Sequence, residues 1–139
     1  MKQKRSWVNI YHDGKGGNFL IFAMGGGASG RSLLDPPEEI ARNEFDTRIG
    51  AALVEALDAY QERASNHQIW RASEGARKFI SKHLCVSIER MEAGDLDVVP
   101  LHHEGSGYIG KQGQHIIVPA AEINGRIAAV LKEAFAVAS

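Results

Sequence analysis

Two strand-like segments joined by a short glycine-rich connection limit the fold of this chain most strongly. Residues 6–12, SWVNIYH, alternate between two sets of side chains and are rich in β-branched and aromatic types, as strands are. The polar segment DGKGGN follows at 13–18, and the apolar run FLIFAM at 19–24 comes next. This order predicts a β-hairpin whose second strand is central in a sheet, with both of its faces covered.

The glycine run that follows, GGGASGRS at 25–32, matches two phosphate-binding patterns by its letters, with Arg31 in place of the usual lysine. Both patterns need a helix that begins within the glycines and points its N-terminus at the phosphate. Pro36 and Pro37 would interrupt such a helix at a cost of about 3 kcal/mol or more each. We therefore expect no nucleotide site here and interpret residues 25–30 as a flexible strand-to-helix loop, with Arg31 at the surface.

Later segments predict helices and a second group of strands. Asp35 is expected to cap a helical turn that starts with Pro36 and Pro37, with Glu38 completing a capping box, and the main helix spans about 46–63. Further helices are predicted at 74–83, after Ser73, and at 121–137, and Trp70 is expected to anchor the connector between the first two. Strands are predicted at 84–91, 95–101 and 115–119, with a loop at 102–114.

The predicted order, ββ-α-α-βββ-α, favours an α+β fold: a largely antiparallel sheet of about five strands with helices packed against it. A length of 139 residues with 44% hydrophobic content fits a single domain over 1–139. The lone cysteine, Cys85, cannot form an internal disulfide, and no segment reads as a secretion signal or a membrane span. These features predict a cytoplasmic protein.

The net charge and the candidate metal-binding and nucleophilic residues limit the classes of function. A formal net charge of −1 disfavours nucleic-acid binding through bulk positive charge, and with it a DNA-binding regulator. The residue types at His102, His103, Glu104 and His115 suit zinc, but adjacent histidines on an extended segment point to opposite sides. We interpret them as polar loop residues and Cys85 as a small core residue, and we expect no metal, no cofactor and no enzymatic activity.

Several segments together resemble the immunity proteins of contact-dependent growth inhibition. The resemblance lies in the run from Trp7 to Phe19, which has a longer gap than the family pattern, in GAALVEAL-x-x-Y at 50–60, and in HLCVSIER at 83–90. VVPL, IIVPA and LKEAFAVA extend it toward the C-terminus. It covers most of the chain and rests on hydrophobic spacing and a few aromatic, glycine and proline positions.

The resemblance implies a binding role. Such proteins are small, bacterial and cytoplasmic, and each sequesters the C-terminal toxin domain, often a nuclease, of a cognate effector. It implies a protein partner, with no direct nucleic acid, membrane or small-molecule substrate. Because the toxin-contacting surfaces of these families diverge, contact residues cannot be carried over from the resemblance.

Acidic side chains gather in the helical region and in the later strands, where the simplest interpretation is a solvated surface. The sharper one is a negative patch that docks a basic protein by mimicking nucleic-acid phosphate. The candidate partner-binding residues are Asp58, Glu62, Glu89, Glu92, Asp95, Asp97, His102, His103 and Glu104. The alternative is a small ligand-binding or hydrolytic enzyme that uses the glycine loops 25–30 and 105–113, with His102 or His103 as an acid–base group.

Overall fold

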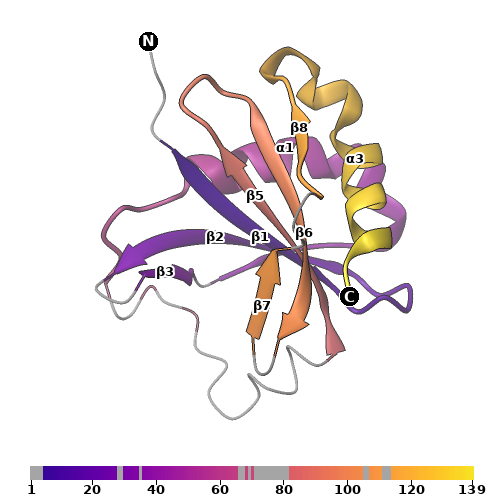
Figure 1. Cartoon of the computed structure of the whole chain (residues 1–139), viewed down its shortest axis with the longest axis horizontal. Coiled ribbons are helices and arrows are strands. Elements are labelled where there is room, and N and C mark those ends of the chain that lie inside the picture. Colours follow the sequence, from indigo (N-terminus) through magenta and orange to yellow (C-terminus); the bar gives the residue numbers. More distant parts are fainter. Residues whose placement is uncertain are drawn as a thin grey trace.

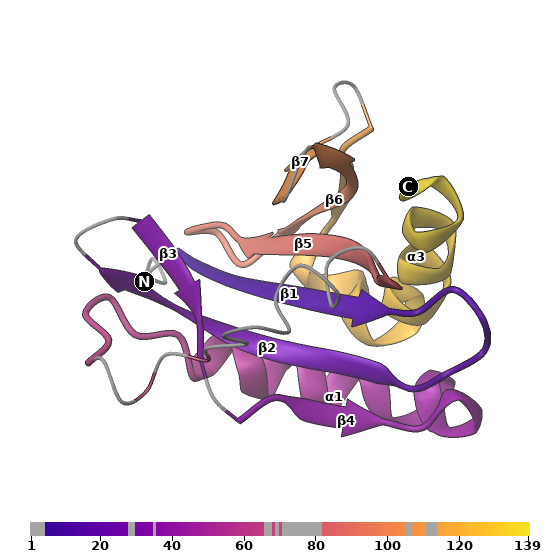
Figure 2. The same cartoon turned by 90° about the horizontal axis from the view of Figure 1, so that it is seen from below.

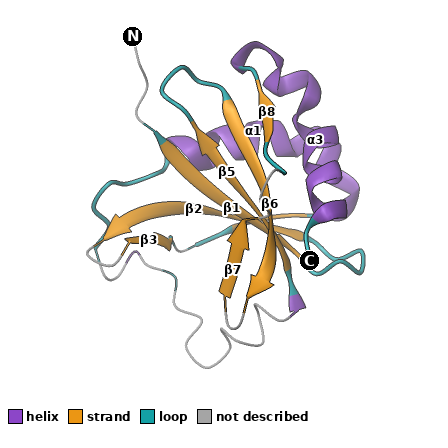
Figure 3. Ribbon diagram, in the orientation of Figure 1, coloured by secondary structure: helices purple, strands orange, loops and turns teal. Residues whose placement is uncertain are grey.

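The computed structural model describes residues 5–27, 30–34, 36–65, 68, 70, 82–104, 107–110 and 114–139 (Figure 1). Within these ranges the helices are α1 (Phe45–Asp58) and α3 (Ile123–Val137), each preceded by a short 3₁₀ turn. Figure 3 distinguishes these helices from the strands of the sheet. The strands are β1 (Ser6–His12), β2 (Phe19–Gly27), β3 (Gly30–Leu33), β4 (Glu38–Ile40), β5 (Leu84–Arg90), β6 (Leu96–Glu104), β7 (Gly107–Gly110) and β8 (Ile116–Val118).

Four long strands form the middle of one eight-stranded sheet, in the order β2-β1-β5-β6. The strand pairings are antiparallel throughout. The outer edge of β2 pairs with β3 and β4, and the outer edge of β6 pairs with β7 and β8. Figure 2 shows α1 and α3 on the same side of this curled sheet. The predicted α+β class, with a largely antiparallel sheet in a single domain, is confirmed.

The predicted hairpin is confirmed and forms part of the core. β1 and β2 pair from His12 with Phe19 through Val8 with Ala23. On one face of the sheet, Ile21 belongs to the main core, which the apolar sides of α1 and α3 complete. On the other face, Phe22 packs with Tyr11, Cys85 and Trp70. Both faces of β2 are therefore covered, as its apolar run predicts, and Trp70 serves as the expected anchor.

The glycine run is a strand and not the predicted flexible loop. Gly25 to Gly27 end β2 and pair with Gly30 to Ser32 of β3. The N–H of Gly26 donates to the Gln61 carbonyl at 2.8 Å, and the N–H of Ala64 donates to the Gly26 carbonyl at 3.0 Å. A Cβ on Gly26 would lie 2.3 Å from the Glu62 carbonyl oxygen, so the glycine permits this close backbone approach. The side chain of Arg31 is outside the described part of the chain.

The helix predicted to begin at Pro36 is also wrong. Glu38 to Ile40 form β4, which pairs with Phe19 to Ile21, and Ile40 is fully buried. Burial of Ile40 against β2 therefore outweighs the local capping pattern, and Asp35 lies outside the described residues. Because the glycines lead into strand β3 and not into a helix, neither phosphate motif has the helix that it needs.

The main helix is shorter than predicted, and residues 102–114 are not all loop. α1 ends at Asp58 because the chain then turns back to β2, where Gln61 N–H donates to the Met24 carbonyl at 3.2 Å. β6 continues through residues 102–104 and pairs with β7. The strands predicted near 84–91, 95–101 and 115–119 and the C-terminal helix are confirmed. The helix predicted at 74–83 falls almost wholly outside the described residues.

The additional strands explain why the sheet exceeds the predicted five. β3, β4 and β7 are edge strands of three or four residues, too short for an alternating pattern to stand out. No helix in the described part of the chain is long and apolar enough to cross a membrane.

Candidate functional site

Two carboxylates lie side by side on neighbouring strands at one end of the sheet, on the face opposite α1 and α3. Glu89 of β5 and Asp97 of β6 are register partners, with Trp7 beside Glu89 on β1 and Ile117 beside Asp97 on β8. Side chains at register partners share a face, so Trp7, Glu89, Asp97 and Ile117 form one line across four strands, here named the acidic row. Asp97 and Glu89 are only 18% and 17% exposed, whereas Ile117 is 49% exposed.

Each carboxylate of the acidic row has a nitrogen-bearing partner within the chain, an arginine for Glu89 and a histidine ring for Asp97. Arg5 forms an ion pair with Glu89 and also lies over the Trp7 ring, with its guanidinium carbon 5.6 Å from the ring centroid. His115 Nδ1 lies 3.0 Å from both carboxylate oxygens of Asp97. Like charges directly opposite in a sheet are destabilising, and the positive charge of Arg5 offsets that repulsion. Because Arg5 and His115 are both 54% exposed, either is accessible to an incoming group.

Asp58, the last residue of α1, and Glu62, in the chain that follows, lie near the same end of the sheet. Asp58 Oδ1 pairs with Arg90 Nη1 at 2.8 Å, and Glu62 lines a cavity of about 310 Å³ with Asp58, Arg90 and Ser6. Arg5 lines this cavity as well as pairing with Glu89, so it connects the cavity to the acidic row.

Glu92 and Asp95 belong to the β5–β6 turn, at the same end of the sheet. Glu92 is exposed. The Asp95 carboxylate accepts the Ala120 N–H at 2.9 Å, where the 3₁₀ turn before α3 begins. Asp95 therefore has a structural role in holding the start of the C-terminal helical segment.

The other candidate residues lie at the far end of β6. His102 and His103 alternate between the two faces of the strand, as expected for an extended segment. The side chain of Glu104 is outside the described part. The structure thus brings Asp58, Glu62, Glu89, Glu92 and Asp97 to one end of the sheet and separates them from His102 and His103. Arg5, Trp7, His115 and Ile117 complete the acidic row, and the sequence does not place them in a partner-binding site because it does not give the strand register.

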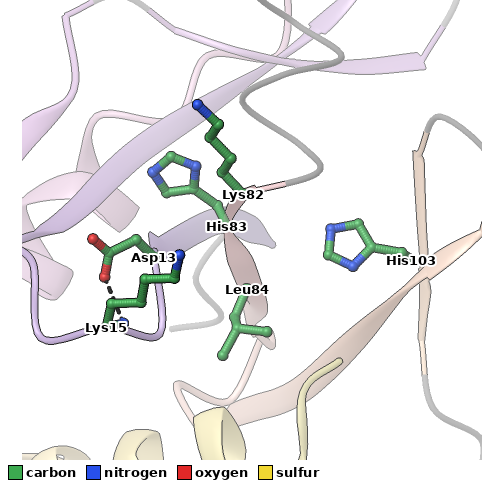
Figure 4. Close-up of a pocket in the computed structure, with 6 residues that line it drawn as sticks. All are labelled: Asp13, Lys15, Lys82, His83, Leu84 and His103. Atoms are coloured by element: carbon green, nitrogen blue, oxygen red, sulfur yellow. Dashed lines mark hydrogen bonds between the residues drawn. The ribbon is translucent and has the colours of Figure 1, made fainter.

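A second cavity, of about 430 Å³, lies at that far end (Figure 4). His103 of β6 faces the β1–β2 loop, which contributes Asp13 and Lys15, and the segment of Lys82, His83 and Leu84. Of this set, only His103 is a site candidate from the sequence, because the lining comes from three segments that are far apart in the chain. Among the described residues, the lining combines two lysines and two histidines with a single carboxylate.

Asp13 is held in place by the loop that it belongs to. Its Oδ1 accepts the N–H groups of Lys15 at 2.8 Å and Gly17 at 3.1 Å. These two hydrogen bonds lower the pKa of the Asp13 carboxyl below its ordinary value. The neighbouring ring of His12 accepts the Gly14 N–H at Nδ1 and faces the Gly17 carbonyl with Nε2 at 3.0 Å, which fits a neutral ring protonated at Nε2.

Cys85 is a core residue, as predicted. Its side chain is fully buried beside Tyr11 and Phe22, and burial raises the pKa of its thiol well above the ordinary value. A neutral buried thiol is a poor nucleophile. Among the described residues, no three His, Cys, Asp or Glu side chains are grouped closely enough to hold a metal ion.

The fold has a solved counterpart. The chain is similar to the structure described as "Protein of Unknown Function NMB0488 from Neisseria meningitidis", with a TM-score of 0.76 and 12% sequence identity. The alignment covers 100% of this chain and 98% of the other. At this identity the likeness shows a shared fold and carries no information about activity. No protein-family model matches the chain, and no curated protein sequence does.

Proposed function

We propose that this chain is an immunity protein that binds and neutralises the C-terminal toxin domain of a cognate contact-dependent growth inhibition effector. It acts in the cytoplasm of the producing cell, by stoichiometric binding and without chemistry or a cofactor. The toxin domain is a nuclease in this proposal, so its active-site surface is basic, and the immunity protein presents carboxylates where the toxin would bind phosphates.

The observation that carries the proposal is the acidic row. Glu89 and Asp97 stand side by side on a face of the sheet that carries neither α1 nor α3, and both carboxylates are already largely removed from water. A charge in such a setting interacts more strongly with an incoming cation than a fully exposed one does. Strands also hold the two carboxylates in a fixed relation, which lowers the entropic cost of binding a toxin arginine or lysine.

The ends of the acidic row supply the apolar contacts that a protein interface needs. Ile117 is 49% exposed although it is large and apolar, and Trp7 is half-buried with its ring beside Tyr60 at a centroid distance of 5.3 Å. Tryptophan and arginine often dominate interface energetics, and Arg5 lies over Trp7. On toxin binding, Arg5 is expected to give up Glu89 to a toxin cation or to share it.

Co-expression with the toxin domain encoded immediately upstream tests this function. Cells that carry both proteins should grow, and the two should purify together as a stoichiometric complex. Cells that carry the toxin domain alone should stop growing. Continued growth arrest in the presence of the folded chain, or its failure to purify with the toxin domain, would exclude the proposed role.

The alternative hypothesis is an enzyme that uses two glycine loops, but the first of these segments belongs to a strand. Gly25 to Gly27 lie within β2, and His102 and His103 point to opposite faces of β6. Only His103 lines the cavity at the far end of the sheet. A thermal-shift screen with ATP and NAD still separates the two classes, because a ligand that binds the native state raises its melting temperature.

A further inference from the structure

We propose that the cavity formed by Asp13, Lys15, Lys82, His83, Leu84 and His103, here named the far-end cavity, binds a small phosphate monoester. This site lies at the opposite end of β5 and β6 from the acidic row, and the proposal does not depend on toxin binding. The volume of about 430 Å³ falls within the range of small-molecule sites.

The charges of the far-end cavity favour an anion. Lys15 and Lys82 carry positive charge and make no ion pair within the described part of the chain, and Asp13 is the single acidic residue among the described residues of the lining. The lining is therefore net positive even when both histidines are neutral. Two ammonium groups without carboxylate partners among the described residues leave an excess of positive charge around the cavity, and a bound dianion neutralises it.

The negative charge of Asp13 does not cancel the positive charge of the cavity, because its carboxylate is engaged by its own loop. Its Oδ1 accepts hydrogen bonds from the backbone N–H groups of Lys15 and Gly17, which hold the carboxylate against its own loop. Oδ2 accepts none of the hydrogen bonds resolved among the described residues and is left to receive a hydroxyl. A ligand that carries both a phosphate and hydroxyl groups, such as a sugar phosphate or a mononucleotide, matches this combination of donors and acceptor.

The two histidines face the same space from different strands. His83 precedes β5, and His103 lies on β6 opposite the β1–β2 loop, as Figure 4 shows. Imidazole N–H groups donate to phosphate oxygens, and Leu84 adds an apolar side to the cavity. Two imidazole rings and two lysines around one small cavity suit a compact oxyanion better than an extended polymer.

Isothermal titration of the intact protein with inorganic phosphate, adenosine 5′-monophosphate and adenosine, at constant ionic strength, tests the proposal. The monophosphate should bind and adenosine should not. Binding of free phosphate as tight as that of the monophosphate would identify the oxyanion itself as the ligand, whereas weaker binding would identify the monoester. Failure of both phosphates to bind, or equal binding of adenosine and its monophosphate, would overturn the proposal.

Single variants locate the site. Lys15→Met and Lys82→Met should each weaken monophosphate binding by about tenfold or more, because each removes a charge-assisted contact. Lys132→Met is the matched control, since it removes the same charge from α3, where Lys132 pairs with Asp46. Equal weakening by all three variants would show that net charge, and not the far-end cavity, governs binding. Thermal melts establish that each variant is folded.

Discussion

Replacing Gly26 with alanine should destabilise the protein through a backbone clash. An added Cβ would lie 2.3 Å from the Glu62 carbonyl oxygen and 3.2 Å from its carbon. Contacts below 3.0 Å essentially do not occur, so β2 and the chain after α1 must separate. This separation strains the hydrogen bonds of Gly26 N–H to Gln61 at 2.8 Å and of Ala64 N–H to Gly26 at 3.0 Å.

The expected cost of Gly26→Ala follows from these contacts. Two backbone hydrogen bonds at about 1 kcal/mol each, together with steric strain, predict a loss of about 2–3 kcal/mol in the free energy of unfolding. Gly125→Ala is the matched control, because the space around Gly125 in α3 is open: apart from its chain neighbours and the helix's own backbone, no heavy atom lies within 4 Å of the added Cβ. That variant should gain about 0.5–1 kcal/mol, because alanine favours the helix.

Urea unfolding measures both Gly→Ala variants, with the midpoint falling for Gly26→Ala and rising for Gly125→Ala. Hydrogen exchange at the Ala64 amide separates global loss from local detachment of residues 61–64. If Gly26→Ala matched the wild type in both midpoint and exchange, the close approach of Glu62 to β2 would be wrong.

Three further outcomes follow from the described contacts. Phe22→Ala removes a fully buried ring whose centroid lies 4.9 Å from that of Trp70 and should cost about 3–5 kcal/mol in chemical denaturation. The pKa of Asp13 is lower in the folded protein than in the unfolded chain, so its carboxylate stabilises the fold at pH values above the unfolded pKa. This stability is lost as the pH falls through the folded pKa. Asp13→Asn should therefore make the free energy of unfolding depend less on pH on the acid side. Buried Cys85, whose thiol pKa is raised, should resist alkylation in the native protein and react once urea unfolds it; rapid native labelling would contradict its burial.

Long periodic segments predict their own structure well in this chain. The hairpin of residues 6–24 and the helix at 123–137 carry complete side-chain patterns, and both form as expected. Gly25 to Gly27 carry no side chains, so their strand conformation leaves no alternating signal, and its cause, the approach of Glu62, is tertiary. The sequence does not predict β4 for a related reason, because the burial of Ile40 against β2 is tertiary and competes with a local capping pattern.

The candidate site depended even more on tertiary information. Glu89 and Asp97 were identifiable as acidic residues on two strands, but their pairing requires the register across the Met91–Asp95 turn. Alternate positions counted outward from that turn would place Glu89 and Asp97 on the same face of the sheet. Arg5 and His115 lie 84 and 18 residues from their partners, and nothing local in the sequence connects them.

The affinity of the toxin domain for the acidic row tests the central claim most directly. Isothermal titration should compare the wild-type chain with the double variant Glu89→Gln, Asp97→Asn, which keeps side-chain shape and removes two charges. The control is Glu55→Gln, Glu133→Gln, which removes two charges from exposed positions on α1 and α3. We predict that the first variant binds at least about tenfold more weakly and that the control stays within about twofold of the wild type. Equal affinity of the folded acidic-row variant and the wild type would contradict toxin recognition through Glu89 and Asp97.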